Sequence, residues 1–119
     1  MQIRIAALRE GPEELFDQLP IVGTMLHLLP GPDRPDYWLV QLRRPLSWFD
    51  RGIERSISHL LLASRFAGVP LSPGVSGVTA GIALVTDARL VHEPSVDLEK
   101  SVHVGVGDCD VVACRAELD

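Results

Sequence analysis

Histidines are the residues of this chain best suited to metal binding or proton transfer, and there are four: His27, His59, His92 and His103. No two have the H-x-H, H-x-x-x-H or H-E-x-x-H spacing that would place two metal ligands on one strand or helix. His103 is the best placed, because it alternates with valines and precedes a cysteine between two aspartates. One interpretation is a cluster of His103, Cys109 and His92 that binds a metal or activates a thiolate. We favour a surface histidine beside a polar turn, and we predict neither a metal nor another cofactor.

The two cysteines, Cys109 and Cys114, are five residues apart, so in a strand their side chains would point to opposite faces. This spacing disfavours a shared metal or a disulfide between them. Asp108 and Asp110 flank Cys109, and nearby negative charge raises the pKa of a thiol, the wrong direction for a nucleophile. Cys114 is expected to be a small core residue. We predict no catalytic residue.

Residues 105–110 (GVGDCD) contain two glycines and two aspartates, a composition that suggests a phosphate or calcium loop. The segment lacks the third glycine of G-x-G-x-x-G and the Lys-Ser/Thr of a P-loop. Two acids are also too few for a calcium loop. We therefore predict a turn or bulge at Gly107-Asp108, and keep His103 and Asp108 as candidate binding residues.

Arg65 ends a predicted buried strand and precedes a long loop, residues 67–77, in which five of eleven residues are Gly or Pro. A loop of this length is more often functional than a median connection. An arginine facing it could bind a carboxylate or phosphate through its bidentate fork. A structural ion pair with an acid such as Asp87 is the simpler account, and Arg65 stays a candidate binding residue.

Basic and aromatic residues interleave at one place, where Arg43 and Arg44 lie between Trp38 and the pair Trp48-Phe49. In a small barrel this could form a stacking platform for single-stranded nucleic acid. The acidic total and a proline within the segment weaken that hypothesis. Aromatic residues and arginine are enriched at protein interfaces, so an exposed Trp48-Phe49 edge favours a protein contact.

Composition indicates a folded, soluble protein, since 46% of the 119 residues are hydrophobic and 23% are charged. This length accommodates one domain, residues 1–119. The net charge of -5 disfavours nucleic acid or an anionic membrane as a partner. Residues 61–119 carry eight acids against four bases, which suits a cationic partner better. The N-terminus lacks a signal-peptide pattern and no apolar run approaches the roughly 20 residues that span a bilayer, so we expect a cytoplasmic protein.

Strands are the elements that must position these residues, because period-two alternation recurs along the chain. A helix of about two turns is predicted after Gly11-Pro12, ending at Pro20. Gly23 suggests a bulge, and Pro45 is expected to end a strand or push it to a sheet edge. The predicted strands cover residues 2–8, 21–29, 37–42, 58–65, 78–86, 101–106 and 110–114.

Residues 50–63 decide the fold class. Asp50-Arg51-Gly52 predicts a hairpin turn between residues 46–49 and a strand that starts near Ile53. A helix at about 50–63 is the alternative, and it would make the fold α+β. With the hairpin, the fold is mainly β: a small antiparallel barrel or sandwich of six to eight short strands with one short N-terminal helix.

Three functions fit these patterns. The first is a non-enzymatic protein-interaction module that binds a partner or itself, and an acidic antidote-like binder is one form of it. The second is a small enzyme or small-ligand-binding barrel with a site under the 67–77 loop. It requires at least two of five residues to converge within a pocket: His59, Arg65, His92, His103 and Asp108. The third, which we favour least, is a single-stranded nucleic-acid-binding barrel. The first leads because it requires no catalytic constellation.

Overall fold

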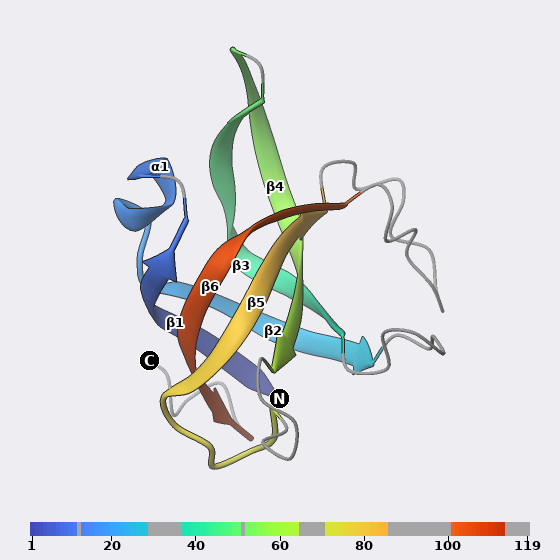
Figure 1. The fold of residues 1–119 in the computed structure, drawn as a ribbon. Coiled ribbons are helices and arrows are strands. Elements are labelled where there is room, and N and C mark those ends of the chain that lie inside the picture. Colours follow the sequence, from blue (N-terminus) through green and yellow to red (C-terminus); the bar gives the residue numbers. More distant parts are fainter. Residues whose placement is uncertain (12, 29–36, 51, 65–70, 86–100, 114–119) are drawn as a thin grey trace.

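The period-two segments form six strands that close into one antiparallel barrel, in which each strand pairs with its neighbours along the chain and the last returns to the first (Figure 1). This computed structural model describes residues 1–11, 13–28, 37–50, 52–64, 71–85 and 101–113. The mainly β fold predicted from the sequence is confirmed, with six strands and one helix. They are β1 (Gln2–Glu10), α1 (Glu13–Phe16), β2 (Ile21–Leu28), β3 (Trp38–Asp50), β4 (Ile53–Ser64), β5 (Val78–Val85) and β6 (Ser101–Val112).

The interior of the barrel is aliphatic, and alternate residues of every strand supply it. Along β3, Val40 and Leu42 face this core, whereas Leu39 belongs to a separate buried cluster with Leu61 of β4 and Ala83 of β5. That second cluster lies on the opposite face of the sheet, since Leu60 and Leu62 on either side of Leu61 belong to the main core. Both faces of this part of β3 therefore contribute to buried clusters.

Residues 50–63 form a hairpin, and the helical alternative for them is wrong. The pairing runs from Leu46 opposite Ile57 to Asp50 opposite Ile53. Gly52 has a φ of 82°, a left-handed conformation that glycine adopts at little cost in a tight turn.

The helix is shorter than predicted, with four residues in place of about two turns. The amide N–H groups of Gln18 and Leu19 donate to the carbonyl oxygens of Leu15 and Phe16, three residues back, at 3.1 and 3.4 Å. These tighter bonds end the α-helix before Pro20, which cannot donate. Leu15 is buried in the core and fastens α1 to the barrel.

β6 is continuous through Gly107-Asp108, so of the two alternatives predicted there the turn is wrong. Register shifts do lie opposite these residues, between Ile5 and Ala7 and between Leu8 and Glu10 of β1.

The glycines of β6 permit close approach to β1. A Cβ atom on Gly107 would lie 2.9 Å from the Ala7 carbonyl oxygen and 3.0 Å from Ile82 Cδ1, and one on Gly105 would collide with the Glu10 carbonyl oxygen. Turn-forming and close-packing glycines look alike in a sequence.

β3 does not end at Pro45, so that alternative is wrong. The other alternative, a sheet edge, agrees with the pairing, because the last described β3 residue that pairs with β2 is Leu42. The pairing of β3 with β4 skips from Gln41 opposite His59 to Leu46 opposite Ile57, so four residues of β3 face Ser58 alone. Proline has no N–H for the ladder, and a bulge is one of the few places where a strand accommodates it. Three further predictions lie outside the described residues: the loop start at residues 67–70, the roles of Asp87 and His92, and the placement of Cys114.

β2 does contain a bulge, but its register shift lies between Met25 and His27 and not at Gly23. Gly23 instead lies directly against β3, because a Cβ atom there would be 2.7 Å from the Gln41 carbonyl oxygen.

Candidate functional site

The distal part of the β3–β4 hairpin projects beyond the barrel, because β2 pairs with β3 only as far as Leu42 and β5 pairs with β4 only from Leu60 onward. Among the described residues, strand pairing over residues 46–57 is therefore confined to β3 and β4. Figure 1 shows the two strands rising past the end of the barrel, with α1 beside them. We call residues 48–53 the hairpin tip.

Side chains from the α1 region take the place of a strand along the outer edge of β3. The Gln18 side-chain amide donates to the Ser47 carbonyl oxygen at 2.9 Å, and its Oε1 accepts from the Ser47 N–H at 2.8 Å. The Glu14 carboxylate accepts from the Phe49 N–H at 3.1 Å. These bonds satisfy an otherwise unpaired strand edge, and they hold the hairpin in position.

Apolar side chains are exposed at the hairpin tip. Phe49 is 55% exposed and Ile53 is 60% exposed. Trp48 is partly buried and packs against the main core, so it anchors the base of the tip. Trp48 is therefore partly exposed and Phe49 is exposed, so the hairpin tip presents apolar side chains that are held in position by the α1 region.

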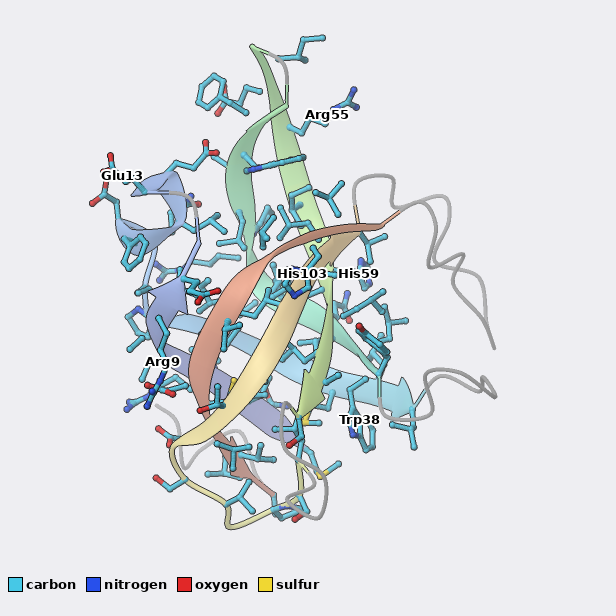
Figure 2. The ribbon with its side chains drawn as sticks, viewed as in Figure 1. Arg9, Glu13, Trp38, Arg55, His59 and His103 are labelled. Atoms are coloured by element: carbon cyan, nitrogen blue, oxygen red, sulfur yellow. The ribbon has the colours of Figure 1, made fainter. Side chains whose placement is uncertain are left out.

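Among the described side chains around the hairpin tip, acids outnumber bases. Glu13, Asp17 and Glu54 are exposed on α1, on the turn that follows it and on β4, and Arg55 is an exposed base on the same hairpin. Figure 2 shows Glu13 and Arg55 at this end of the molecule, remote from Trp38 at the opposite end. A partner with basic groups around an apolar surface would complement this end.

His103 and Cys109 do not form the cluster that one interpretation of the sequence required. Cys109 is fully buried inside the barrel, whereas His103 is exposed. Burial raises the pKa of the Cys109 thiol to about 12, with smaller contributions from the charges of Asp108 and Asp110. Across the described residues, no group of three or more His, Cys, Asp or Glu side chains is placed to hold a metal ion.

Asp108 and Asp110 are engaged in structural contacts. The Arg9 guanidinium donates to Asp108 at 2.9 Å, and the Thr79 hydroxyl donates to the same oxygen at 3.3 Å. Asp110 accepts from the Gly77 N–H and the Ser76 hydroxyl, both at 2.9 Å. Asp108 therefore contributes to cross-strand packing around β6, and its carboxylate is already paired.

The described part of the predicted loop, residues 71–77, is fastened to the barrel. Gly74 N–H donates to the Val111 carbonyl oxygen at 2.9 Å, and Val111 N–H donates to the Val75 carbonyl oxygen at 3.0 Å. Leu71 belongs to the buried core. These contacts attach residues 71–77 to β6. Arg65, the candidate next to this loop, lies outside the described residues.

His59 is half-buried, and its ring Nδ1 lies 2.8 Å from the Ser58 hydroxyl. Burial lowers the pKa of its imidazole.

The enzyme hypothesis required at least two of the candidate groups to converge in a pocket. Of the three that the structure describes, neither His59 nor His103 nor Asp108 lines the pocket described next.

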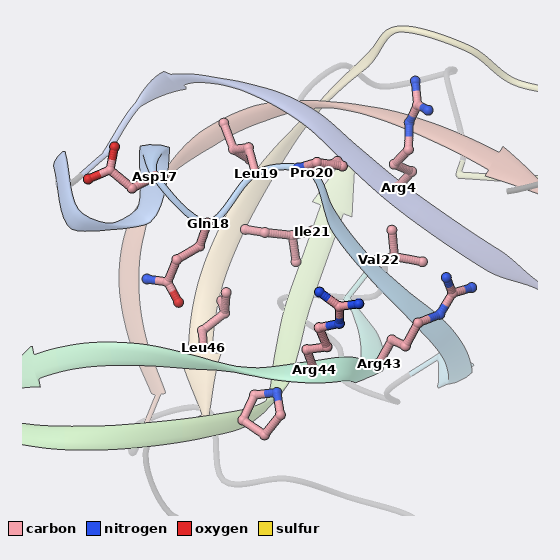
Figure 3. A pocket seen from close by; sticks show the side chains of 11 residues that line it. Arg4, Asp17, Gln18, Leu19, Pro20, Ile21, Val22, Arg43, Arg44 and Leu46 are labelled. Atoms are coloured by element: carbon pink, nitrogen blue, oxygen red, sulfur yellow. The ribbon is translucent and has the colours of Figure 1, made fainter. Parts of the chain in front are cut away.

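A pocket of about 540 Å³ lies between the start of β2 and the β3 bulge, and no local sequence pattern predicted it. Three arginines line it: Arg4 from β1, and Arg43 and Arg44 from the bulge. Figure 3 shows Arg43 and Arg44 extending from β3 toward β2, with Arg4 on the other side of β2. Arg4 is about forty positions from the other two arginines in the chain, so only the strand order brings it to the same pocket.

The aromatic residues near these arginines in sequence are not their neighbours on a common platform. Trp38 and Trp48 both pack against the main core. Stacking of successive bases requires exposed aromatic faces beside the basic groups. Both tryptophans therefore use part of their surface for core packing and are only partly available for stacking.

Comparisons with models of known protein families, with curated proteins and with solved structures each gave no match to this chain. Among the described residues, the only helix is far too short to cross a membrane. The chemistry of the site itself must therefore support any assignment of function.

Proposed function

We propose that this protein is a non-enzymatic interaction module whose hairpin tip docks onto a partner protein. The observation that carries the proposal is the pair of exposed apolar side chains, Phe49 and Ile53, at the end of a braced hairpin. Large apolar side chains at a projecting tip lose contact with water when a partner covers them, and burial of each contributes roughly 1.5–3 kcal/mol. Trp48 at the base supplies a rigid support of the kind found at interface anchors.

The partner we infer is a protein with an apolar depression bordered by basic side chains. Exposed acids around the tip, on α1 and on β4, provide the complementary charge. The net charge of -5 acts in the same direction at longer range, where it accelerates encounter with a cationic partner. Self-association would bring two acidic ends together, so it is the less favoured occupant.

Site-specific photo-crosslinking tests the proposal. A benzophenone amino acid replaces Phe49 in one variant and Leu26 in a control variant, in cells that naturally contain the protein. Leu26 is a matched control because it is a 40% exposed leucine on β2, away from the tip. We expect a crosslinked heterologous protein from position 49 and not from position 26. The adduct should disappear when Ile53→Asp is added.

Two outcomes contradict the proposal. Equal labelling from both positions, or labelling that survives Ile53→Asp, would show that the tip has no specific partner. A concentration-dependent dimer in light scattering, abolished by Ile53→Asp, would show that the occupant is a second copy of the chain and not a basic partner. Circular dichroism of Ile53→Asp controls for folding, and we expect no change because Ile53 is 60% exposed.

A further inference from the structure

The two edges of the projecting hairpin differ in what lies beside them. Along β3, side chains of the α1 region bond the backbone of Ser47 and Phe49. Along β4, pairing with β5 begins only at Leu60, and β3 is the only strand in the described part of the chain that pairs with residues 53–57. Within the described chain, the outer edge of β4 is therefore the unpaired edge of the hairpin (Figure 1).

The register shows which backbone groups lie on this edge. In an antiparallel pair, residues directly opposite each other either exchange both backbone hydrogen bonds or direct their N–H and C=O groups away from each other. Ser47 and Phe49 direct theirs away from β4, because they bond the side chains of the α1 region. Their partners across the hairpin, Ser56 and Glu54, therefore direct their N–H and C=O groups away from β3. Both residues are exposed, so these groups can accept another strand.

Residues 53–57 (IERSI) have few of the features that keep a strand edge from pairing. They contain neither proline nor lysine, and their pairing with β3 is regular, from Ile53 opposite Asp50 to Ile57 opposite Leu46. Isoleucine at both ends favours an extended backbone. Edges of this kind are where binding domains take up an extended segment of a partner, with affinity from main-chain hydrogen bonds and specificity from the alternating side chains.

The side chains on the two faces of β4 indicate which strand would fit. Glu54 and Ser56 lie on one face, and Ile53 and Ile57 lie on the other, because successive side chains of a strand alternate. Ile57 is fully buried and Ile53 is 60% exposed, so an apolar side chain beside Ile53 would extend a row that begins in the core. A basic side chain beside Glu54 would form a cross-strand pair of opposite charges, whereas an acidic one would be repelled.

We propose that the partner of the hairpin tip binds by adding an extended strand to the outer edge of β4, and that basic residues alternate with apolar ones in this strand. The basic residues lie on the Glu54 face, and the apolar residues lie on the Ile53 face. This inference rests on the proposed function, because it specifies how the partner is held. A second copy of the chain is the less favoured source of the strand, since it would bring the acids of two hairpin tips together.

Amide hydrogen exchange of the full chain, measured by NMR with a short acetylated and amidated peptide of alternating lysine and valine, tests the inference. We expect the N–H groups of Glu54 and Ser56 to exchange at least about tenfold more slowly with the peptide bound, because each gains a hydrogen bond. The Arg55 N–H faces β3 and is the internal control, so its exchange should not change. A peptide of alternating glutamate and valine should give no protection.

Ser56→Pro and Ser56→Ala form a matched pair of variants. Proline removes the N–H that would bond the partner, and it spares the pairing with β3 because that N–H faces away from β3. Alanine keeps the N–H. We expect Ser56→Pro to weaken binding of the lysine peptide by about tenfold or more, and Ser56→Ala to leave it unchanged. Circular dichroism shows whether both variants fold, and the exchange measurement on the unsubstituted chain depends on neither.

Absence of protection at Glu54 and Ser56, or equal peptide affinity of the two Ser56 variants, would overturn strand addition. Equal protection by the glutamate peptide would overturn the basic character of the strand. Protection of the same amides when the chain alone is concentrated would assign the edge to a second copy and overturn the heterologous strand.

Photo-crosslinking from position 49 separates this inference from the proposed function. An adduct that is equally strong with Ser56→Pro and Ser56→Ala would overturn strand addition and leave docking of the hairpin tip intact. Absence of an adduct without any substitution at Ser56 would instead overturn the proposed function, on which the inference rests. An adduct that is lost with Ser56→Pro and kept with Ser56→Ala would support both.

Discussion

Asp110 joins two distant parts of the chain, because its carboxylate accepts hydrogen bonds from Ser76 and Gly77 and lies 3.5 Å from the Arg4 guanidinium. The Gly77 N–H lowers the pKa of this carboxyl most, followed by the Ser76 hydroxyl, and Arg4 adds to the effect. These three groups stabilise the charged form that exists at neutral pH. Asp110 therefore holds residues 71–77 against β6, and we expect this attachment to weaken when the carboxylate is protonated at low pH.

Asp110→Asn should lower the free energy of unfolding at pH 7 by about 1–3 kcal/mol, since it removes a charge that three donors stabilise. The pKa of Asp110 is lower in the folded state than in the unfolded state, so the stabilisation is complete above the unfolded value, near 3.9, and is lost as pH falls through the folded value. Urea unfolding of both proteins at pH 7, 5 and 3 should show a difference that shrinks only below about pH 4. Asp17→Asn, at an exposed position, is the control, and an equal effect there would contradict the explanation.

The sequence correctly predicted that the pKa of the Cys109 thiol is raised, but it did not identify the main cause. Two flanking aspartates do raise the pKa of the thiol, but burial inside the barrel is the larger cause. The proposed partnership with His103 failed because β6 has a register shift opposite Ile82 and Ala83. Strict alternation cannot reveal on which side of a strand a residue lies beyond such a shift.

At the scale of elements, the α1 region shields β3 with side chains. Gln18 offers the Ser47 backbone both a donor and an acceptor, as a neighbouring strand would. Such shielding protects the projecting hairpin from pairing with other chains along this edge. The brace also lowers the conformational entropy that the tip would lose on binding.

Gln18→Ala should loosen the hairpin without unfolding the barrel. Two hydrogen bonds to Ser47 disappear, so amide hydrogen exchange at Ser47 should accelerate by about tenfold, the equivalent of roughly 1.4 kcal/mol of local stability. Exchange at Leu61 in the buried part of β4 should not change. Asp17→Ala at the neighbouring exposed position serves as the control. Unchanged exchange at Ser47 in Gln18→Ala would mean that the side-chain bonds do not hold this edge.

Most strands could be predicted because glycine and proline mark the turns and loops between them. The hairpin turn before Gly52 and the strand at Val78–Val85 follow from local patterns alone. The arginine pocket could not be predicted, since it depends on a four-residue bulge and on which strand lies beside which. Local patterns contain neither the register nor the neighbours of a strand.

For the molecule as a whole, closure of the barrel depends on how closely β6 approaches β1. Gly107 permits this approach, because a side chain there would meet the Ala7 backbone and Ile82 at about 3 Å. Gly81 on β5 differs, since a Cβ atom there would make only ordinary contacts, 3.5 Å from His103 Nε2. The two positions form a natural pair for a test.

Gly107→Ala should lower the free energy of unfolding by about 1–3 kcal/mol, the range for inserting a carbon into a packed interior. Gly81→Ala should change it by less than about 0.5 kcal/mol, as expected for a substitution that meets no crowded neighbour. Urea unfolding monitored by tryptophan fluorescence measures both. If the two variants lose equal stability, close approach is not the reason for glycine at position 107.

The pairing of β1 with β6 also determines when the chain can fold. Gln2 lies opposite Val112, and Ile5 lies opposite Cys109, so this seam joins the most distant parts of the described chain. The β3–β4 hairpin, by contrast, joins residues that are close in sequence and can form early. During synthesis, β1 waits with one edge unpaired until the last strand emerges. We therefore expect this barrel to complete its fold only after translation of β6. Until then the chain must avoid aggregation through the unpaired edge of β1.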